Sequence, residues 1–386
     1  MPGAIIVLSF ATDPVQGRGR VYESRRKPVN EQLRYHTEEA ASTVVGKHAM
    51  NVAIIGAGAW GTTLSMLSVA AGNPTTLVAH LPELVHHLTT HRRHPHSLPR
   101  VTLPLSISIE TDAREAVASA DIVILAVPTQ KLRAAMATLR DGLGGKIVVS
   151  AAKGLESGTL VRPTEVISDV LGGDVVERLC TLSGPNLATE VANGKPAATV
   201  VASRGEAAAS AVQRALTTPG FRVYLSDDVV GVEMGGALKN IIAIGAGIGD
   251  GLDAGDNAKA AFLTRGIAEI ARLGVASGAQ ALTFAGLSGI GDLIATCSSA
   301  LSRNHTVGRE LAKGRKLEEI LASMSEVTEG VATTKAALTL GARLGVELPI
   351  VEQMHRVLFE GLSPIEAVAT LMEREPTREL GGPHSP

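Results

Sequence analysis

Short apolar runs and helical periodicities alternate along the chain from residue 52 to residue 225. Eight of these runs have the length and character of buried strands, at residues 52–55, 75–79, 107–109, 122–127, 146–150, 180–183, 198–202 and 221–225. Helical patterns lie between several of them, for instance at residues 113–119, 129–139 and 163–171. Strands separated by crossover helices form a parallel sheet with helices on both faces, and the later strands leave room for an antiparallel portion.

The pattern changes after residue 227, where strand-like runs stop and only helical periodicities follow. They cover residues 229–249, 258–273, 303–313, 317–324, 330–344, 349–359 and 363–372. We therefore predict an α/β domain over residues 50–226 and an all-helical domain over residues 227–373. A ligand at the carboxyl edge of the sheet would lie in the cleft between these domains.

The two ends of the chain differ from the rest. Residues 1–49 are polar and mixed in charge apart from residues 4–10, and we predict a disordered extension. A targeting or partner-binding arm is the alternative, and Met50, just before the first strand, is a second candidate start of translation. Residues 374–386 contain several prolines and glycines and are predicted to be flexible.

Composition and charge narrow the class of protein. A formal net charge of −2 argues against a nucleic-acid partner, because no global basic field is present. The two cysteines, Cys180 and Cys297, have no metal-like spacing, and no secretory signal precedes them, so we expect a cytoplasmic protein. The apolar segments are broken by Gly, Lys or Asp within about 18 residues, so no membrane span is expected.

A stretch rich in proline and histidine, at residues 91–104, is interpreted as a surface loop. A metal site is one interpretation of the four histidines in and before it, which are His86, His87, His91 and His94. No carboxylate or cysteine lies in ligand register with them, so we predict a solvated surface and no bound metal.

A glycine-rich turn joins the first strand to the first helix. Gly56, Gly58 and Gly61 have the G-x-G-x-x-G spacing, and a run of small and apolar residues follows from Thr62. The first glycine permits a sharp turn, the second leaves the backbone open to a pyrophosphate, and the third lets helix and strand pack closely. Because the motif lies between a predicted strand and a predicted helix, it favours dinucleotide binding over an ordinary structural turn.

The end of the second strand bears on the choice between NAD and NADP. A carboxylate there would bind the ribose 2′-hydroxyl and favour NAD. The chain instead has His80 and Leu81, with Glu83 a little later. Nothing at this position obviously repels a 2′-phosphate, so we expect NADP to be tolerated and leave the preference between the cofactors open.

Three basic residues have surroundings that suggest chemistry. Lys153 follows closely after a strand, where its ammonium group would point into the ligand cleft. Lys239, with Asn240, interrupts a helix of small and apolar residues. Burial there lowers the pKa of a lysine toward the range of a general base, although a solvent-facing lysine is the more common case. Arg303 begins a helix, where a guanidinium group and free N–H groups form an anion site.

Seven motifs together resemble, in order and spacing, the bacterial type of NAD(P)-dependent glycerol-3-phosphate dehydrogenase. They are GAGAWG, AKGLE, SGPNLA, GGALKNIIAIGAGIGDG, GIGDLIATC, SRN and VTEG, within residues 50–372. The resemblance implies a Rossmann-type dinucleotide-binding domain followed by an all-helical domain, usually in a homodimer. It also implies interconversion of sn-glycerol 3-phosphate and dihydroxyacetone phosphate, supplying glycerol 3-phosphate for glycerophospholipid synthesis.

The resemblance also assigns roles to residues within and near these motifs. Lys239 corresponds to the proton donor and acceptor at the substrate C2 oxygen, and the other catalytic positions are Asp292, Lys153, Asn240 and Thr296. Substrate contacts are assigned to Lys153, Gly184, Asn186, Lys239, Asp292, Ser302, Arg303 and Asn304. Cofactor contacts are assigned to Gly56, Gly58, Ala59, Trp60, Gly61, His80, Lys153, Ala188, Arg303, Val327 and Glu329.

Two positions depart from the family pattern, and two other functions remain open. The family often has arginine after the second strand, where this chain has His80, and Asn186 stands where many relatives have serine or threonine. Another two-domain dehydrogenase, of the 3-hydroxyacid or 6-phosphogluconate type, is the main alternative, although the Ser302-Arg303-Asn304 element favours a small phosphate ester. A non-catalytic dinucleotide sensor is the second alternative, and it has no need of a catalytic lysine.

Overall fold

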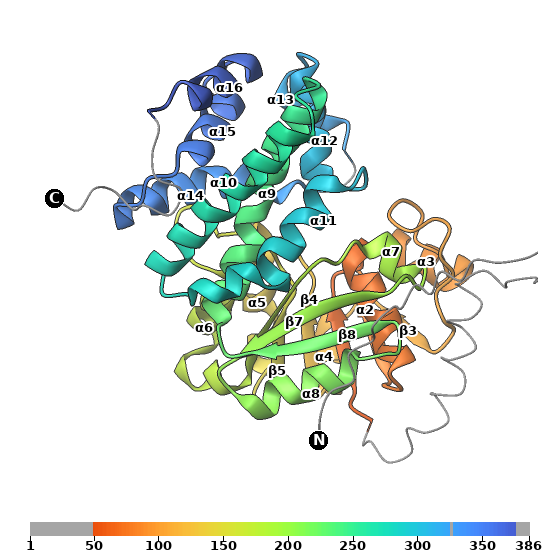
Figure 1. Ribbon diagram of the computed structural model, residues 1–386. Coiled ribbons are helices and arrows are strands. Elements are labelled where there is room, and N and C mark those ends of the chain that lie inside the picture. The colour runs from red at the N-terminus through yellow and green to blue at the C-terminus, as the bar shows by residue number, and fades with distance from the viewer. Residues whose placement is uncertain (1–48, 325–326, 376–386) are drawn as a thin grey trace, which may run out of the picture. The chain divides into compact units, whose positions relative to one another are not determined.

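The computed structural model describes residues 49–324 and 327–375, and the structural statements below concern these residues (Figure 1). The predicted disordered extension over residues 1–49 and the predicted flexible tail over residues 374–386 fall almost wholly outside this part of the chain.

One eight-stranded sheet organises the first half of the chain. Its order is β3-β2-β1-β4-β5-β6-β7-β8, with β6 and β7 antiparallel and all other neighbours parallel. The strands are β1 (Val52–Ile55), β2 (Thr75–Val78), β3 (Ile107–Glu110), β4 (Ile122–Leu125), β5 (Ile147–Ser150), β6 (Leu179–Ser183), β7 (Ala197–Ser203) and β8 (Phe221–Ser226). The order of the first six strands is that of a Rossmann fold, which places a ligand at the carboxyl edge near β1 and β4.

Helices cover both faces of this sheet (Figure 1). Residues of α2 (Ala59–Ala70), α3 (Pro82–His91) and α8 (Glu206–Leu216) pack on one face. Residues of α4 (Ala113–Ala118), α5 (Thr129–Leu139) and α6 (Pro163–Leu171) pack on the other. The short helix α7 (Ala188–Ala192) follows β6. The predicted α/β architecture with an antiparallel portion is therefore confirmed.

All eight predicted strands are present, with ends that differ from the predicted ones by at most two residues. The fourth strand ends at Leu125 instead of residue 127, because the chain turns toward Pro128 after the N–H of Ala126 donates to Ile55 O. The residue pattern does not predict α3, α7 or α8. Leu88 is the one buried residue of α3.

The second half of the chain is helical and is built around α9 (Val229–Gly251), most of whose residues are buried. Against α9 pack α10, α11, α12 and α14 (Figure 1). The other helices are α10 (Asp256–Ala276), α11 (Asp292–Ser298), α12 (Arg303–Ala312), α13 (Leu317–Ala322), α14 (Glu329–Leu344), α15 (Pro349–Phe359) and α16 (Pro364–Met372). The predicted fold class, a Rossmann-type domain followed by an all-helical domain, is thus correct.

The length and composition of α9 correct one expectation from the sequence. This helix is long and apolar enough to cross a membrane on those criteria alone, so interruption by Gly, Lys or Asp does not by itself exclude a span here. However, 89% of its apolar window is buried inside the fold, as in the core helix of a globular domain.

Glycines let α9 and α12 approach each other closely. A Cβ atom at Gly247 would fall on the carbonyl oxygen of His305, and one at Gly308 would fall on that of Ile244. Gly247 therefore serves the close packing of the two helices. The close approach brings the first turn of α12 beside α9, and both helices carry candidate site residues.

Candidate active site

The glycine turn between β1 and α2 has the geometry of a dinucleotide site. Gly56 has φ +111°, and a Cβ there would lie 2.5 Å from the carbonyl oxygen of Ala126, the residue after β4. A Cβ at Gly61 would fall on the carbonyl oxygen of Gly56, so α2 packs directly against the turn. Gly58 is the N-cap of α2, and a Cβ there meets nothing within 4 Å. Open space over a helix N-terminus fits a pyrophosphate.

The other predicted cofactor residues of the sheet domain lie around this turn. Ala59 and Trp60 form the first turn of α2, and the Trp60 ring packs against Phe221 with centroids 6.3 Å apart. Ala188 begins α7, and its carbonyl oxygen accepts a hydrogen bond from Thr63 of α2 at 3.2 Å. His80 follows β2 and is exposed.

The histidines that follow β2 are dispersed over α3 and the next loop. His87 and His91 stack with ring centroids 4.3 Å apart, while Nδ1 of the buried His94 accepts the N–H of Ser97 at 3.0 Å. Within the described part of the chain, no three His, Cys, Asp or Glu side chains are grouped so as to hold a metal ion.

A single carboxylate joins the two lysines predicted to be catalytic. Asp292 Oδ1 accepts from Lys239 Nζ at 2.5 Å, and Asp292 Oδ2 accepts from Lys153 Nζ at 2.7 Å. Lys239 also donates to Thr296 Oγ1 at 2.6 Å, and Lys153 also donates to the carbonyl oxygen of Gly184 at 3.0 Å. The fold therefore brings five predicted site residues into direct contact, from α9, α11 and the loops after β5 and β6.

The position of Asp292 depends on an unusual helix start. A short turn at Leu287–Gly291, kinked at Gly289 (φ −95°, ψ −106°), precedes α11, and Asp292 is the first residue of α11. Asp292 is 1% exposed and Lys239 is 6% exposed, so water screens their interaction little.

Burial sets the protonation of Lys239. Loss of hydration lowers the pKa of this lysine to about 8, because desolvation disfavours the ammonium form. The negative charge of Asp292 acts in the opposite direction, and the positive charge of Lys153 lowers the pKa further. A lysine with this pKa exchanges a proton near neutral pH, as a general acid or base must.

A chain of amides connects this group to α12 and α14. Asn304 Nδ2 donates to Asn240 Oδ1 at 2.9 Å, and the N–H of Gly330 donates to Asn304 Oδ1 at 3.1 Å. Asn240 Nδ2 lies 3.4 Å from the carbonyl oxygen of Lys153, which is a long contact. Asn240 and Asn304 are both buried next to the lysine group.

The predicted phosphate element lies at the start of α12. Ser302 caps this helix, with its hydroxyl oxygen accepting the N–H of His305 at 3.3 Å. Arg303 is exposed, and its Nη1 donates to the carbonyl oxygen of Val327 at 2.6 Å. This contact joins Arg303 and Val327, two positions predicted to bind the cofactor. The guanidinium group and the helix N-terminus together favour an anion.

Glu329 reaches from α14 to the sheet domain. Its Oε1 accepts the N–H of Thr129, the first residue of α5, at 3.0 Å. Its Oε2 is buried without a hydrogen-bond partner among the described residues, and burial raises the pKa of this carboxyl group. The sequence analysis did not single out Thr129, although it follows the Ala126-Val127-Pro128 turn after β4.

The loop after β6 carries two further predicted substrate residues. Gly184 has φ +153°, and a Cβ there would lie 3.0 Å from Cα of Thr199. Asn186 Nδ2 donates to the carbonyl oxygen of Ala198 at 2.9 Å, whereas Asn186 Oδ1 is buried without a partner in the described part of the chain. Ser183, which the sequence analysis did not assign, has a buried hydroxyl without such a partner beside Gly236 of α9.

Comparison with known proteins identifies relatives over most of the chain. Residues 51–209 match the family described as NAD-dependent glycerol-3-phosphate dehydrogenase N-terminus, and residues 228–369 match the corresponding C-terminus. Two similar proteins are both named glycerol-3-phosphate dehydrogenase (NAD(P)+). The one from Chlorobium phaeobacteroides (strain BS1) is 46% identical over 333 residues, covering 86% of this chain and 100% of the relative. The one from Syntrophotalea carbinolica is 48% identical over 332 residues, with coverage of 86% and 100%.

A solved structure extends the comparison to the fold. The crystal structure of glycerol-3-phosphate dehydrogenase from Coxiella burnetii is similar with a TM-score of 0.80 and 32% sequence identity, covering 84% of this chain and 99% of that chain.

Proposed function

The chain belongs to the family of NAD(P)-dependent glycerol-3-phosphate dehydrogenases, and we propose that Lys239 is the proton donor and acceptor of its reaction. The enzyme interconverts sn-glycerol 3-phosphate and dihydroxyacetone phosphate, and NAD(P), when bound, takes or returns the hydride at substrate C2. Family membership removes the case for a 3-hydroxyacid or 6-phosphogluconate dehydrogenase and for a non-catalytic sensor.

The observation that carries this proposal is the buried lysine with a pKa of about 8 beside one carboxylate. Oxidation at C2 requires that the hydroxyl proton leave, and neutral Lys239 is available to accept it at and above this pH. In the reverse direction the Lys239 ammonium donates a proton to the oxygen that gains negative charge. Asp292 and Thr296 orient the nitrogen, and Lys153 provides a second positive charge near the same oxygen.

The substrate phosphate is assigned to the start of α12. Arg303 and the N-terminus of α12 supply binding energy remote from the reacting carbon, which fixes C2 against the proton donor. Ser302 and Asn304 complete this element, while Gly184 and Asn186 are assigned to the glycerol end. The glycine turn and Ala188 are assigned to the cofactor, with Val327 and Glu329 contributing from the helical half.

The activity is tested with the purified full-length chain. Absorbance of NADH and of NADPH is followed separately after addition of dihydroxyacetone phosphate. We expect oxidation of at least one cofactor, and the ratio of the two kcat/KM values reports how His80 affects cofactor choice. Absence of oxidation of both, with cofactor binding retained, would contradict the proposed function.

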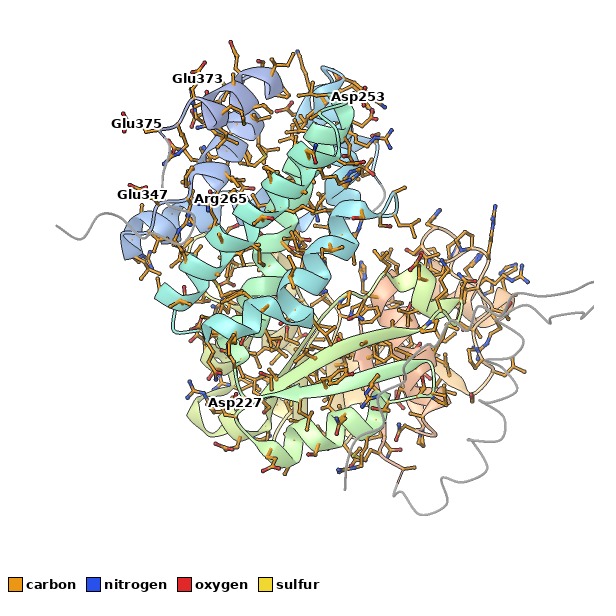
Figure 2. The ribbon with its side chains drawn as sticks, in the orientation of Figure 1. Asp227, Asp253, Arg265, Glu347, Glu373 and Glu375 are labelled. Atoms are coloured by element: carbon orange, nitrogen blue, oxygen red, sulfur yellow. The ribbon has the colours of Figure 1, made fainter. Side chains whose placement is uncertain are left out.

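A homodimer that uses the outer face of α16 is part of the proposal. Ile365, Val368 and Met372 are 67%, 39% and 80% exposed at spacings that place them on one face of α16. Val368 and Met372 line a cavity of about 1350 Å³ whose lining also includes Arg265 and Glu347, labelled in Figure 2. Small-molecule pockets usually occupy roughly 300–1,000 Å³. A larger apolar face with charges of both signs suits a second copy of the chain.

Light scattering after size exclusion tests the dimer. The wild-type chain is expected to be dimeric, and Val368→Glu should shift it toward the monomer. Leu105→Glu, at a position that is 86% exposed in the sheet domain, is the matched control and should leave the mass unchanged. A monomeric wild type at micromolar concentration would refute the dimer. The same measurement on a chain that begins at Met50 separates two possible occupants of the α16 face. A dimer that persists without residues 1–49 supports a second copy of the chain.

Three wider assignments complete the proposal. The domains are residues 50–226 for cofactor binding and residues 227–373 for catalysis, since the strands end at Ser226 and α9 begins at Val229. A cytoplasmic location is supported by Cys180 and Cys297, both buried and unpaired. Supply of glycerol 3-phosphate for glycerophospholipid synthesis is the metabolic role that follows from the product. Cell fractionation and measurement of glycerol 3-phosphate after loss of the enzyme test the last two.

A further inference from the structure

The loop that carries Lys153 has to be held in place by contacts outside regular secondary structure. It connects β5 to α6 across residues 151–162. The ammonium group at its start makes two directed contacts, with Asp292 and with the carbonyl oxygen of Gly184. A lysine side chain has many rotamers, so a moving loop would weaken both contacts.

Two side chains of α5 fasten this loop. Gln130 binds it through both ends of its amide, since Nε2 donates to the carbonyl oxygen of Leu155 at 2.8 Å and Oε1 accepts the N–H of Ser157 at 2.9 Å. Arg133 forms a two-pronged ion pair with Glu156, from Nε to Oε1 at 2.8 Å and from Nη2 to Oε2 at 2.8 Å. Such paired bonds fix direction as well as distance.

The same loop is fixed from its other side by the helical half. Leu155 and Leu160 belong to the apolar core built around α9, and Leu155 is fully buried there. Glu156 is also held internally, since Thr159 Oγ1 donates to its Oε2 at 2.6 Å. The contact with Arg133 lowers the pKa of the Glu156 carboxyl group, which is therefore ionised at neutral pH. The loop is thus clamped between α5 and the core of the helical half.

We propose that Arg133, Glu156 and Gln130, which we call the clamp residues, are positioning residues for catalysis. They hold Lys153 against Asp292, so that the Asp292 carboxylate accepts hydrogen bonds from both Lys153 and Lys239. This inference rests on the proposed roles of Lys153 and Lys239. None of the three clamp residues touches Lys239, so their effect passes through the loop.

The clamp has a consequence for the proton chemistry. The charged or titratable groups that act on Lys239 are Asp292 and Cys297 from α11 and Lys153 from the loop, and Cys297 is a neutral thiol because burial raises its pKa to about 12. Lys153 lowers the pKa of Lys239, and Asp292 raises it. If Lys153 moves away from Asp292, its positive charge repels the Lys239 ammonium group less, and the Asp292 carboxylate interacts with Lys239 alone. Both changes raise the pKa of Lys239.

Arg133→Met tests the clamp, with Asp169→Asn as its matched control. Methionine keeps an unbranched, flexible side chain but removes all hydrogen-bond donors and the positive charge. Asp169 is the second partner of Arg133, at 3.2 Å, so its substitution removes an ion pair of the same arginine but leaves the bond to Glu156. Gln130→Met, at an exposed position, tests the second attachment of the loop, because it removes the two hydrogen bonds of Gln130 to Leu155 and Ser157.

The expected result is a larger change in chemistry than in cofactor binding. Arg133→Met should lower kcat/KM for glycerol 3-phosphate by roughly ten- to a hundredfold, with a smaller change in the Kd for NADH. The pH at which kcat of the oxidation reaches half its maximum should rise by about one unit. Arg133→Lys keeps the positive charge but cannot form the paired hydrogen bonds to Glu156. Its kcat/KM should therefore lie between those of the wild type and Arg133→Met. Asp169→Asn should match the wild type.

Two outcomes would overturn the inference, and they are distinguishable. If Arg133→Met and Gln130→Met retain the wild-type KM and pH profile while the free energy of unfolding falls, the contacts are purely structural. If Lys153→Met itself leaves both kinetic measures unchanged, the proposed role of Lys153 is wrong and the clamp has nothing to position.

Discussion

Replacing Asp292 by asparagine separates its charge from its shape. Asparagine retains an oxygen that can accept from Lys239 Nζ, now 2.5 Å away, but no longer balances the two ammonium groups. An opposite charge in direct contact shifts a pKa by about one to three units. Since Asp292 raises the pKa of Lys239, its loss should lower that pKa from about 8 to roughly 5–7.

This shift has opposite consequences for the two directions of the reaction. At pH 7.5 the fraction of Lys239 in the ammonium form should fall from about three-quarters to about a quarter or less. Reduction of dihydroxyacetone phosphate needs the ammonium, so it should lose more activity than oxidation does. In the oxidation direction the lower pH limb of kcat should move to lower pH, although the maximum falls because the base is weaker.

The assay is a pair of pH profiles, one for each direction, measured with saturating cofactor. Asp250→Asn is the matched control. Asp250 is a carboxylate at the C-terminal end of α9, and it pairs with Lys259 and His305. Its profiles should resemble those of the wild type. A limb for Asp292→Asn that stays near pH 8 or moves upward would refute the reasoning that Asp292 stabilises the ammonium form.

Three further predictions address the phosphate site, the glycine turn and stability. Arg303→Ala should raise KM for glycerol 3-phosphate by roughly ten- to a hundredfold, whereas Arg309→Ala on the same helix should not; an unchanged KM in the first variant would exclude the phosphate role. Gly58→Ala should keep its melting temperature but bind NADH more weakly, and Gly61→Ala should lose about 1–3 kcal/mol of stability, measured by urea unfolding, because its Cβ would overlap Gly56. Burial raises the pKa of Glu269 from 4.5 to about 7, so its protonated form stabilises the fold below pH 4.5 and that stability is lost as pH rises through 7. Relative to Glu269→Gln, the wild-type free energy of unfolding should fall by about 3 kcal/mol across this range, and a constant difference would contradict the assignment.

The sheet and the cofactor turn are predictable because their signals are local. Each strand is a short apolar run, and the glycines at 56, 58 and 61 lie within one turn between β1 and α2. The residue pattern does not predict α3, in which only Leu88 is buried. In α9 the apolar pattern predicts a helix of a length that would suit a membrane span. The pattern does not reveal that 89% of its apolar window is buried inside the fold.

The contacts that organise the site are not local and cannot be seen in the sequence. Asp292 is 53 residues from Lys239 and 139 residues from Lys153, so only the fold reveals that one carboxylate serves both. Glu329 reaches Thr129 across 200 residues. A family resemblance identified most of these residues, but the sharing of Asp292 and the fastening of the Lys153 loop depend on distances that only the structure provides.

Turnover by Lys239→Ala, measured together with NADH binding in the same preparation, is the most direct test of the proposed mechanism. Lys335→Ala, an exposed lysine of α14, is the control and should behave as the wild type. We predict that Lys239→Ala loses roughly 10²- to 10⁴-fold in kcat and binds NADH with the wild-type Kd. Near-normal turnover in this variant would show that another group transfers the proton and would contradict the account.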